Sequence, residues 1–239
     1  MEIDELLTRF PKKRPILDDD VAKIYQIEYK KNRNGETRAS SLAQKLEGWM
    51  HNNVAKSFNP NTSDVCDTLE IGAGTLNQLP FESLSGDYDI IEPMVSLYED
   101  SQFFSRLRNC FTDISEIPTS INYNRIISVA VLEHLDDLPT VVKKSIRHLK
   151  SDGVFACGIP SEGGFLWGLA WRLTTGLEYR IRTGFNYGKL MQHEHLNEAW
   201  EIEKILRYFF KDVSVKRFGL GMHFSLYTFI ECTNPIILD

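Results

Sequence analysis

From residue 65 onward, short apolar runs alternate with polar segments long enough to form helices. The run Ile126-Ile127-Ser128-Val129-Ala130 is almost continuously apolar, as strands are when helices cover both faces of a parallel sheet. Residues 138–150 carry apolar side chains at helical spacing, and Lys150–Gly153 is a helix stop signal. This alternation predicts a doubly wound, Rossmann-like α/β sheet. The predicted parallel strands are Val65–Ile71, Tyr88–Glu92, Asn109–Asp113, Arg125–Ala130 and Val154–Ile159.

The chain after residue 159 departs from this alternation. Pro160–Asn197 is far longer than the roughly two to six residues of an ordinary strand-to-helix connection, so we expect an inserted lid there. Glu198–Phe210 then predicts a helix with Asn197 as its N-cap. Val213–Lys216 and Phe224–Cys232 predict two closing strands that pair as an antiparallel hairpin. The expected sheet therefore has seven strands and is mostly parallel, with an antiparallel last strand.

Residues 1–60 are polar, and their apolar side chains recur at helical spacing up to Asn59-Pro60-Asn61. We expect a helical N-terminal cap over residues 1–60 and a ligand-binding domain over 61–239, with the lid at 160–197. The cap is expected to form a second wall of the pocket, although a purely structural cap explains the same residues almost as well. Its candidate contacts are Tyr25, Tyr29, Gln44 and Trp49.

The charge of the chain excludes one class of function. It has 27 Lys and Arg against 33 Asp and Glu, a net charge of −6, so no global positive field attracts nucleic acid. Its four cysteines form no C-x-x-C pair, and the acidic N-terminus MEIDELLTRF is unlike a signal peptide. The most apolar window, Phe165–Leu173, is less than half of the ~20 residues that span a bilayer. We therefore expect a cytoplasmic protein without a transmembrane segment.

A glycine-containing turn, Gly72-Ala73-Gly74, directly follows the first predicted strand, where glycine lets a ligand touch the backbone. A tight turn needed only for packing explains this short motif as well. Asn77 replaces the third glycine of a dinucleotide fingerprint, which argues against a nicotinamide oxidoreductase, and no P-loop lysine follows. Glu92 ends the second predicted strand, where a carboxylate can bind a ribose diol and disfavours a 2′-phosphate. An adenosine without phosphates fits these features.

Four motifs in order, each at a predicted strand end, resemble those of class I S-adenosylmethionine-dependent methyltransferases. They are Glu70-Ile-Gly-Ala-Gly, Asp89-Ile-Ile-Glu92, Thr112-Asp113-Ile114 and Ile127-Ser-Val-Ala-Val-Leu-Glu-His134, and the match runs from about Val65 to Cys232. Two further segments, Gln44–Met50 and His193–Asn197, resemble small-molecule methyltransferases of bacterial surface-polysaccharide biosynthesis. The resemblance implies S-adenosylmethionine as the cofactor.

The resemblance also implies a residue for each part of that cofactor. Glu70 and the backbone of Gly72, Ala73 and Gly74 would hold the methionine part. Glu92 would bind the ribose hydroxyls, while Asp113 and Ile114 would hold the adenine. A cap on the short segment that follows explains Asp113 without any ligand.

Ala130 would border the amino group and the sulfonium, with Glu133 and His134 just beyond it. His134 is equally explained as a hydrogen-bonded structural histidine at a helix start. The sequence departs from the family at Leu76, where many members have a third glycine. We expect this leucine to leave less room near the methionine tail.

Methyl transfer from a sulfonium is an in-line displacement, which depends mainly on alignment and on the exclusion of water. If the acceptor is a hydroxyl, a base must take its proton, and the candidates are His195, His193 and Glu194, with His195 preferred. An extended backbone would place His193 and His195 on one side, which also permits a metal site, although we expect no metal. A polar entry into the next helix explains the segment as well.

The lid mixes Arg172, Arg180 and Arg182 with aromatic residues, which suits a phosphate-linked sugar, while solvated arginines on a packed flap fit equally. The apolar stretch at its start also suits contact with a membrane surface. We expect transfer of a methyl group to a small molecule, with a sugar or glycan-precursor oxygen as the acceptor, nucleotide-linked or lipid-linked. The alternatives are N-methylation of an amino sugar or small amine, and a non-catalytic regulatory module that binds the cofactor.

Overall fold

The computed structural model describes residues 1–25, 41–57, 65–83 and 85–236, except for the side chains of residues 41–46. The predicted domain boundary at residue 60 lies outside this range, as do Tyr29 and the side chain of Gln44. Within the described residues, no helix is both long and apolar enough to cross a bilayer.

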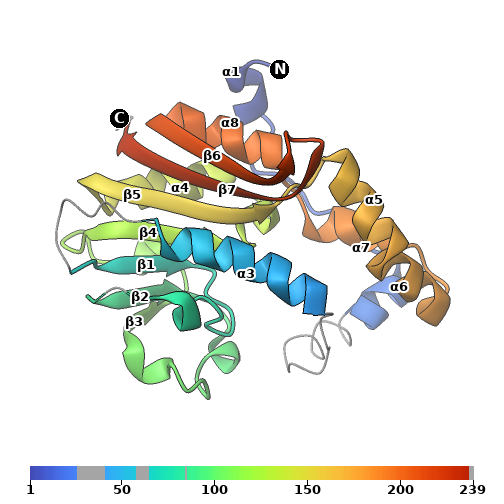
Figure 1. The fold of residues 1–239 in the computed structure, drawn as a ribbon, viewed down its shortest axis with the longest axis horizontal. Helices are drawn as coiled ribbons and strands as arrows, with labels where there is room; N and C mark the ends of the chain where they lie inside the picture. The colour runs from blue at the N-terminus through green and yellow to red at the C-terminus, as the bar shows by residue number, and fades with distance from the viewer. Residues whose placement is uncertain (26–40, 58–64, 84, 237–239) are drawn as a thin grey trace.

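The core is one seven-stranded sheet with strand order β3-β2-β1-β4-β5-β7-β6 (Figure 1). The strands are β1 (Thr68–Ile71), β2 (Tyr88–Ile91), β3 (Leu107–Phe111), β4 (Tyr123–Val129), β5 (Leu149–Pro160), β6 (Phe210–Leu220) and β7 (Phe224–Pro235). The first five strands pair in parallel, and β7 runs antiparallel to both of its neighbours. The predicted Rossmann-like sheet with its antiparallel last strand is confirmed.

Helices cover both faces of this sheet. On one face, α4 (Leu138–Arg147), α8 (Ala199–Phe209) and the short α1 (Ile3–Leu7) bury Val142, Ile202 and Leu6 against the strands. On the other face, α3 (Ser41–Ala55) lies across β4, β5 and β7. A Cβ on Gly158 of β5 would lie 3.1 Å from the Met50 side chain, so the glycine allows α3 to approach closely.

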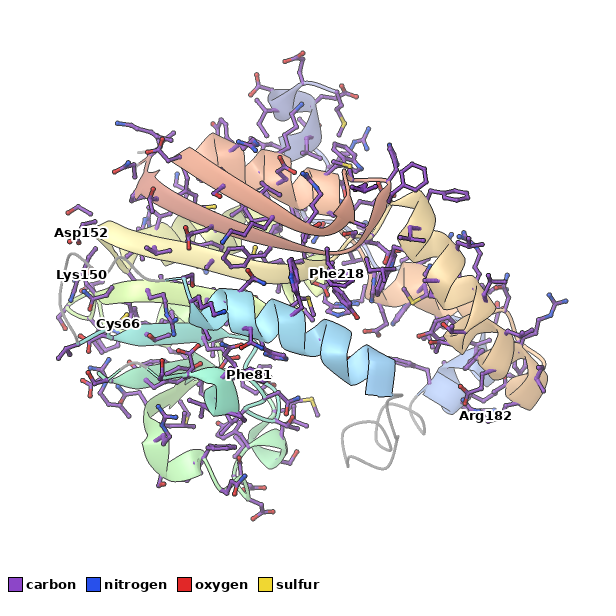
Figure 2. All side chains as sticks on the ribbon, in the orientation of Figure 1. Cys66, Phe81, Lys150, Asp152, Arg182 and Phe218 are labelled. Carbon is purple, nitrogen blue, oxygen red and sulfur yellow. The ribbon has the colours of Figure 1, made fainter. Side chains whose placement is uncertain are left out.

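Three helices occupy the insertion that follows β5: α5 (Phe165–Leu173), α6 (Thr175–Thr183) and α7 (Tyr187–Glu194). In Figure 1, α5 and α6 project from the end of the sheet, beyond the β6–β7 turn. Figure 2 shows Arg182 at the outer end of α6, away from the strands. Short 3-10 turns complete the connections of the described chain at Leu79–Phe81, Val95–Leu97, Phe104–Arg106, Ile114–Glu116 and Leu132–His134.

Two predicted helix signals are wrong. The stop signal Lys150–Gly153 lies inside β5, because α4 already ends at Arg147 and the parallel pairing with β4 begins at Leu149. Asn197 does not cap α8, whose N-cap is Glu198 in a reciprocal pair with Glu201. The Asn197 amide instead donates to the carbonyls of Leu132 and Leu135, 2.8 and 2.7 Å away, and joins α8 to the turn after β4.

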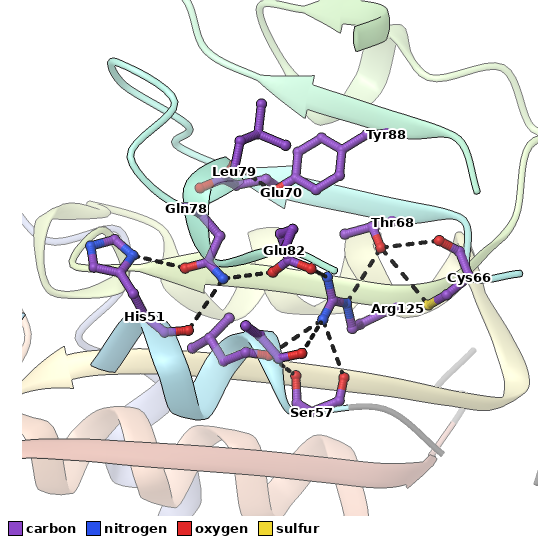
Figure 3. Close-up of polar contacts among 12 residues, drawn as sticks. His51, Ser57, Cys66, Thr68, Glu70, Gln78, Leu79, Glu82, Tyr88 and Arg125 are labelled. Atoms are coloured by element: carbon purple, nitrogen blue, oxygen red, sulfur yellow. Dashed lines mark hydrogen bonds and ion pairs between the residues drawn. The ribbon is translucent and has the colours of Figure 1, made fainter. Parts of the chain in front are cut away.

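A buried arginine ties α3 to the sheet (Figure 3). Arg125 of β4 is fully buried, and its guanidinium donates to the carbonyls of Val54, Ala55 and Ser57 at 3.3–3.4 Å. These carbonyls lie at the carboxyl end of α3, where backbone acceptors lack partners within the helix. The same guanidinium forms an ion pair with Glu82, whose side chain is 2% exposed. Arg125 therefore joins α3, β4 and the segment after β1.

We expect Arg125→Met to lower the free energy of unfolding by about 3–5 kcal/mol, because the buried Glu82 carboxylate would lose its cation. Urea denaturation followed by circular dichroism at pH 7 measures this loss. The double variant Arg125→Met/Glu82→Leu removes the uncompensated charge and should recover most of it. A single-variant loss below about 1 kcal/mol would show that the pair behaves like an exposed ion pair.

Candidate functional site

A cavity of about 990 Å³ opens at the carboxyl ends of the parallel strands. Parallel α/β sheets bind ligands in this position, outside the strand ends. The structure brings all eleven candidate residues to this one cavity, and whether they act as predicted stays a prediction. They are Glu70, Gly72, Ala73, Gly74, Glu92, Asp113, Ile114, Ala130, His193, Glu194 and His195.

The turn after β1 presents backbone rather than side chains to the cavity. Gly72 has a φ of +72°, and a Cβ there would lie 2.4 Å from the Val131 side chain. Gly74 has a φ of +52°, and a Cβ there would meet nothing within 4 Å, so its bare backbone faces open space. Leu76 also has a positive φ, +63°, but its side chain is fully buried in the core between the sheet and α3. The expectation that Leu76 narrows the pocket is therefore wrong.

Glu92 holds this turn from the end of β2. One carboxylate oxygen accepts from the Gly74 N–H at 2.9 Å, and the other accepts from the Met94 N–H at 3.0 Å. Each oxygen retains further lone-pair capacity, so the carboxylate can accept two hydroxyl donors while it holds the loop. The geometry suits a vicinal diol.

Asp113 follows β3, and its carboxylate accepts from the backbone N–H of Ser115 at 2.8 Å and from the Ser115 hydroxyl. These hydrogen bonds lower the pKa of Asp113 below its usual value, so the group is charged at neutral pH. The capping role considered from the sequence is thus present, and Asp113 lines the cavity as well. The neighbouring Ile114 is buried and provides an apolar wall.

Two buried carboxyl groups lie deeper in the cavity wall. Burial raises the pKa of Glu70 to about 8, although the Tyr88 hydroxyl donates to the Glu70 carboxylate at 2.8 Å. Burial likewise raises the pKa of Glu133 to about 7, and the Glu133 Oε2 atom has no hydrogen-bond partner among the described residues. Ala130, which precedes Glu133 after β4, adopts a left-handed φ of +53°. The cavity therefore contains carboxyl groups that a bound cation or hydrogen-bond donor would stabilise in the charged form.

The histidine segment is the end of a helix, so the extended backbone considered from the sequence is not present, although His193 and His195 both line the cavity. His193 Nδ1 lies 2.7 Å from the Pro15 carbonyl oxygen. Glu194 accepts a hydrogen bond from the Tyr25 hydroxyl, and its backbone carbonyl lies 2.8 Å from His134 Nδ1. Among the residues that the structure describes, no group of three or more acidic, histidine or cysteine side chains forms a metal site.

His195 is oriented by a carboxylate that the sequence analysis missed. His195 Nδ1 lies 2.9 Å from Glu162 Oε2, and the Trp167 indole N–H donates to the same oxygen. A carboxylate on Nδ1 fixes the tautomer that leaves Nε2 as an acceptor. The His134 ring meets the His195 ring edge-on, with centroids 4.9 Å apart. The position of Glu162, two residues after the end of β5, is the signal that would have identified it.

Other residues around the cavity were only partly predicted. Tyr25 and Trp167 line it, whereas Trp49 and the lid arginines are absent from the lining that the described residues form. Arg172 instead lies over the Trp171 ring, 4.5 Å from its centroid. Sequence reasoning also missed Arg14, Glu47, His51 and Tyr227, which come from segments far apart in the chain.

His51 connects this cavity to the buried arginine (Figure 3). Its Nδ1 lies 2.8 Å from the Gln78 side-chain oxygen, and the Gln78 amide donates to Glu82 at 2.6 Å. Glu82 is the carboxylate that pairs with Arg125. One polar chain therefore runs from the wall of the cavity to the carboxyl end of α3.

Comparison with known proteins finds one related sequence and many related structures. No family model matches the chain. A malonyl-[acyl-carrier protein] O-methyltransferase of Acetivibrio thermocellus is 26% identical over 141 residues, which are 56% of this chain and 48% of that protein. The chain thus spans about half the length of the curated relative that it matches.

Solved methyltransferase structures share the fold at low sequence identity. The plantazolicin methyltransferase BpumL in complex with SAH has a TM-score of 0.61 at 14% identity, over 97% of this chain and 99% of that one. Phosphoethanolamine N-methyltransferase 2 of Haemonchus contortus with S-adenosyl-L-methionine has a TM-score of 0.55 at 13% identity, over 78% and 52%. The N-methyltransferase NodS of Bradyrhizobium japonicum has a TM-score of 0.52 at 14% identity, over 81% and 97%. The chain therefore has the fold of the class I S-adenosylmethionine-dependent methyltransferases.

Proposed function

We propose that this protein is an S-adenosylmethionine-dependent methyltransferase that acts on a small molecule, by O-methylation of a sugar or glycan precursor. One observation carries the proposal. Three carboxylates at the ends of adjacent strands, Glu70, Glu92 and Asp113, surround a single cavity beside a turn with a bare backbone. The related methyltransferase sequence and structures support the methyl-transfer part of this proposal.

The residues of the cavity fit this cofactor chemically. Its ammonium and sulfonium groups are cations. Glu70 lies beside the Gly72–Gly74 turn, and a bound cation would lower its raised pKa and stabilise the carboxylate as a partner for the methionine part. Glu92 offers acceptors for the ribose diol. Asp113 and Ile114 combine an acceptor with an apolar wall for the adenine, and Ala130 borders the methionine end.

When bound, S-adenosylmethionine supplies an electrophilic methyl group. The residues of this chain must align the acceptor with it, exclude water and receive the proton that a hydroxyl loses. His195 suits the last role, because Glu162 holds its Nδ1 and stabilises the imidazolium that forms. The Trp167 indole fixes Glu162 in turn.

The aromatic wall favours a sugar as the acceptor. Trp167 of α5 and Tyr227 of β7 both line the cavity, with their ring centroids 5.6 Å apart. Such rings pack against the apolar faces of a pyranose while the histidines and carboxylates bind its hydroxyl groups.

One observation favours the second candidate, N-methylation of an amino sugar or small amine. Glu47, Glu133 and Glu194 line the cavity together with His195, and Arg14 is the fixed cation of the described lining. An acidic wall attracts an ammonium ion, and its carboxylates can take the proton that the nitrogen must lose before it attacks, so this reaction does not require His195 as the base. The requirement for His195 distinguishes the two reactions.

Isothermal titration with S-adenosylmethionine, S-adenosylhomocysteine and NADH tests the cofactor. We expect both sulfur ligands to bind and NADH not to bind. We also expect Glu92→Ala to weaken both sulfur ligands by about tenfold to a hundredfold, since the variant lacks the carboxylate that would accept from the ribose diol and that holds the Gly74 N–H. The matched control is Glu99→Ala on the same connection, because Glu99 is exposed and absent from the described lining. Failure of the wild type to bind either sulfur ligand would overturn the proposal.

Glu70→Gln should stabilise the ligand-free protein while it weakens cofactor binding. The native pKa of Glu70 is about 8, above its usual 4.5, so the wild type loses stability as the pH rises between these values. Glutamine removes this loss, and we expect the variant to exceed the wild type by about 1–3 kcal/mol at pH 9. Urea denaturation at several pH values measures the difference, which should vanish towards pH 4.5. A variant less stable at pH 9 would contradict the assignment.

Release of S-adenosylhomocysteine, measured with a panel of sugars, nucleotide sugars and amines, tests the base. With a hydroxyl acceptor, we expect His195→Ala to lower kcat by about a hundredfold or more, while S-adenosylhomocysteine binding is unchanged. Glu162→Gln should cause a smaller loss, because it disturbs only the orientation of the imidazole. His223→Ala, an exposed histidine on the β6–β7 turn, is the control. A His195→Ala loss below about threefold would instead support alignment alone, as for an amine.

A further inference from the structure

Among the described helices, α5 is the most apolar, yet none of its side chains is buried in the hydrophobic core. None of the nine described residues of α5 is buried, although seven of them are apolar or aromatic. Phe165, Leu169 and Leu173 recur every four residues and are all exposed, Leu173 by 64%. Side chains at this spacing form one stripe along a helix. An exposed stripe of this kind marks a surface for contact with an apolar partner.

Further exposed apolar side chains lie on the elements that contact α5. On α6, Leu177 and Ile181 are 50% and 78% exposed at the same four-residue spacing. At the other end of α5, the Phe165 ring packs against Phe224, with centroids 6.2 Å apart, and Leu220 across the turn is 83% exposed. The Leu166 N–H donates to the His223 carbonyl at 2.8 Å, which fixes the start of α5 on this turn.

We call this surface the lid face: Phe165, Leu169, Leu173, Leu177, Ile181, Leu220 and Phe224. It belongs to a locally basic part of an acidic protein. Residues 165–189 contain three arginines and one lysine against the single acid Glu178, whereas the whole chain has a net charge of −6. Arg172, Arg180 and Arg182 are exposed on the two helices that carry the stripe, and Figure 2 shows Arg182 at the outer end of α6. The lid face therefore combines apolar side chains with positive charge.

We propose that the lid face docks the protein on a bilayer that contains anionic lipids. Apolar side chains flanked by arginines are the composition of interfacial helices, which place their apolar face in the boundary between headgroups and acyl chains. Each arginine near an anionic surface adds electrostatic attraction. The positive charge of the lid face therefore counteracts the repulsion between the membrane and the net negative charge of the chain. A second copy of this protein is disfavoured as the occupant, because a symmetric contact would bring two sets of arginines together.

The position of the lid face gives docking a consequence for the cavity. Trp167 lines the cavity from the same helix whose other side chains form the stripe, and Tyr227 lines it from β7, the strand that begins at Phe224. A docked lid face would hold the mouth of the cavity at the membrane surface. The proposed membrane docking goes beyond the proposed methyl transfer and does not depend on it.

Co-flotation of the full chain with vesicles tests the proposal. Vesicles of phosphatidylcholine alone are compared with vesicles that contain about one third phosphatidylglycerol, at low and high salt. We expect binding to the anionic vesicles, weakened by high salt. We expect Leu173→Gln/Ile181→Gln to reduce the partition coefficient by about tenfold or more, and Arg180→Gln by about fivefold.

The matched control is Phe104→Gln, which removes an apolar side chain of 45% exposure beside β3, at the opposite edge of the sheet from β6. It should bind vesicles like the wild type. Unchanged thermal unfolding of each variant shows that the fold is intact. Absence of wild-type binding, or equal binding by Leu173→Gln/Ile181→Gln and the wild type, would overturn the proposal. Sedimentation that shows a wild-type dimer broken by Leu173→Gln/Ile181→Gln would overturn it in favour of self-association.

Discussion

The ion pair between Arg125 and Glu82 joins two elements that supply walls of the cavity, α3 with His51 and the segment after β1 with Gln78. It places a cation at the carboxyl end of α3, where the helix leaves backbone carbonyls without partners, and it anchors the segment that follows the glycine turn. Because Gln78 and His51 extend the same polar chain to the cavity, the position of α3 and the shape of the ligand site are coupled. A substitution in this buried pair is therefore expected to change the shape of the ligand site, although neither residue contacts a ligand.

The site contains carboxyl groups whose charged form the fold alone does not stabilise. Glu70 and Glu133 are buried with raised pKa values, and one oxygen of Glu133 has no partner in the described structure. Such groups lower the stability of the ligand-free protein, and they make the binding of a cation more favourable. This compromise between stability and binding is typical of functional sites, and it agrees with the proposed cationic cofactor.

The sheet and the strand-end acids were predictable from the sequence, because parallel strands are buried on both faces and end at one edge. The five parallel strands follow that pattern, and the predicted hairpin accounts for the antiparallel pairing of β6 and β7, whereas the order of the strands was not predicted. The histidine segment was not predictable in the same way. Glu162 and His195 are 33 residues apart in the chain and meet only because α5, α6 and α7 fold back. Asn197 likewise donates its side-chain amide to two carbonyls of the turn after β4 instead of capping α8. Contacts of this kind carry no local sequence signal.

Leu76 shows how the loop beside the proposed cofactor site is held in shape. It adopts a backbone conformation that favours glycine, and its side chain is fully buried in the core. Leucine explores fewer backbone conformations than glycine in the unfolded chain, and burial of its side chain offsets the strain of the positive φ. The loop is thus ordered before any ligand arrives. A ligand that binds there pays little conformational entropy, so affinity can come from few polar contacts.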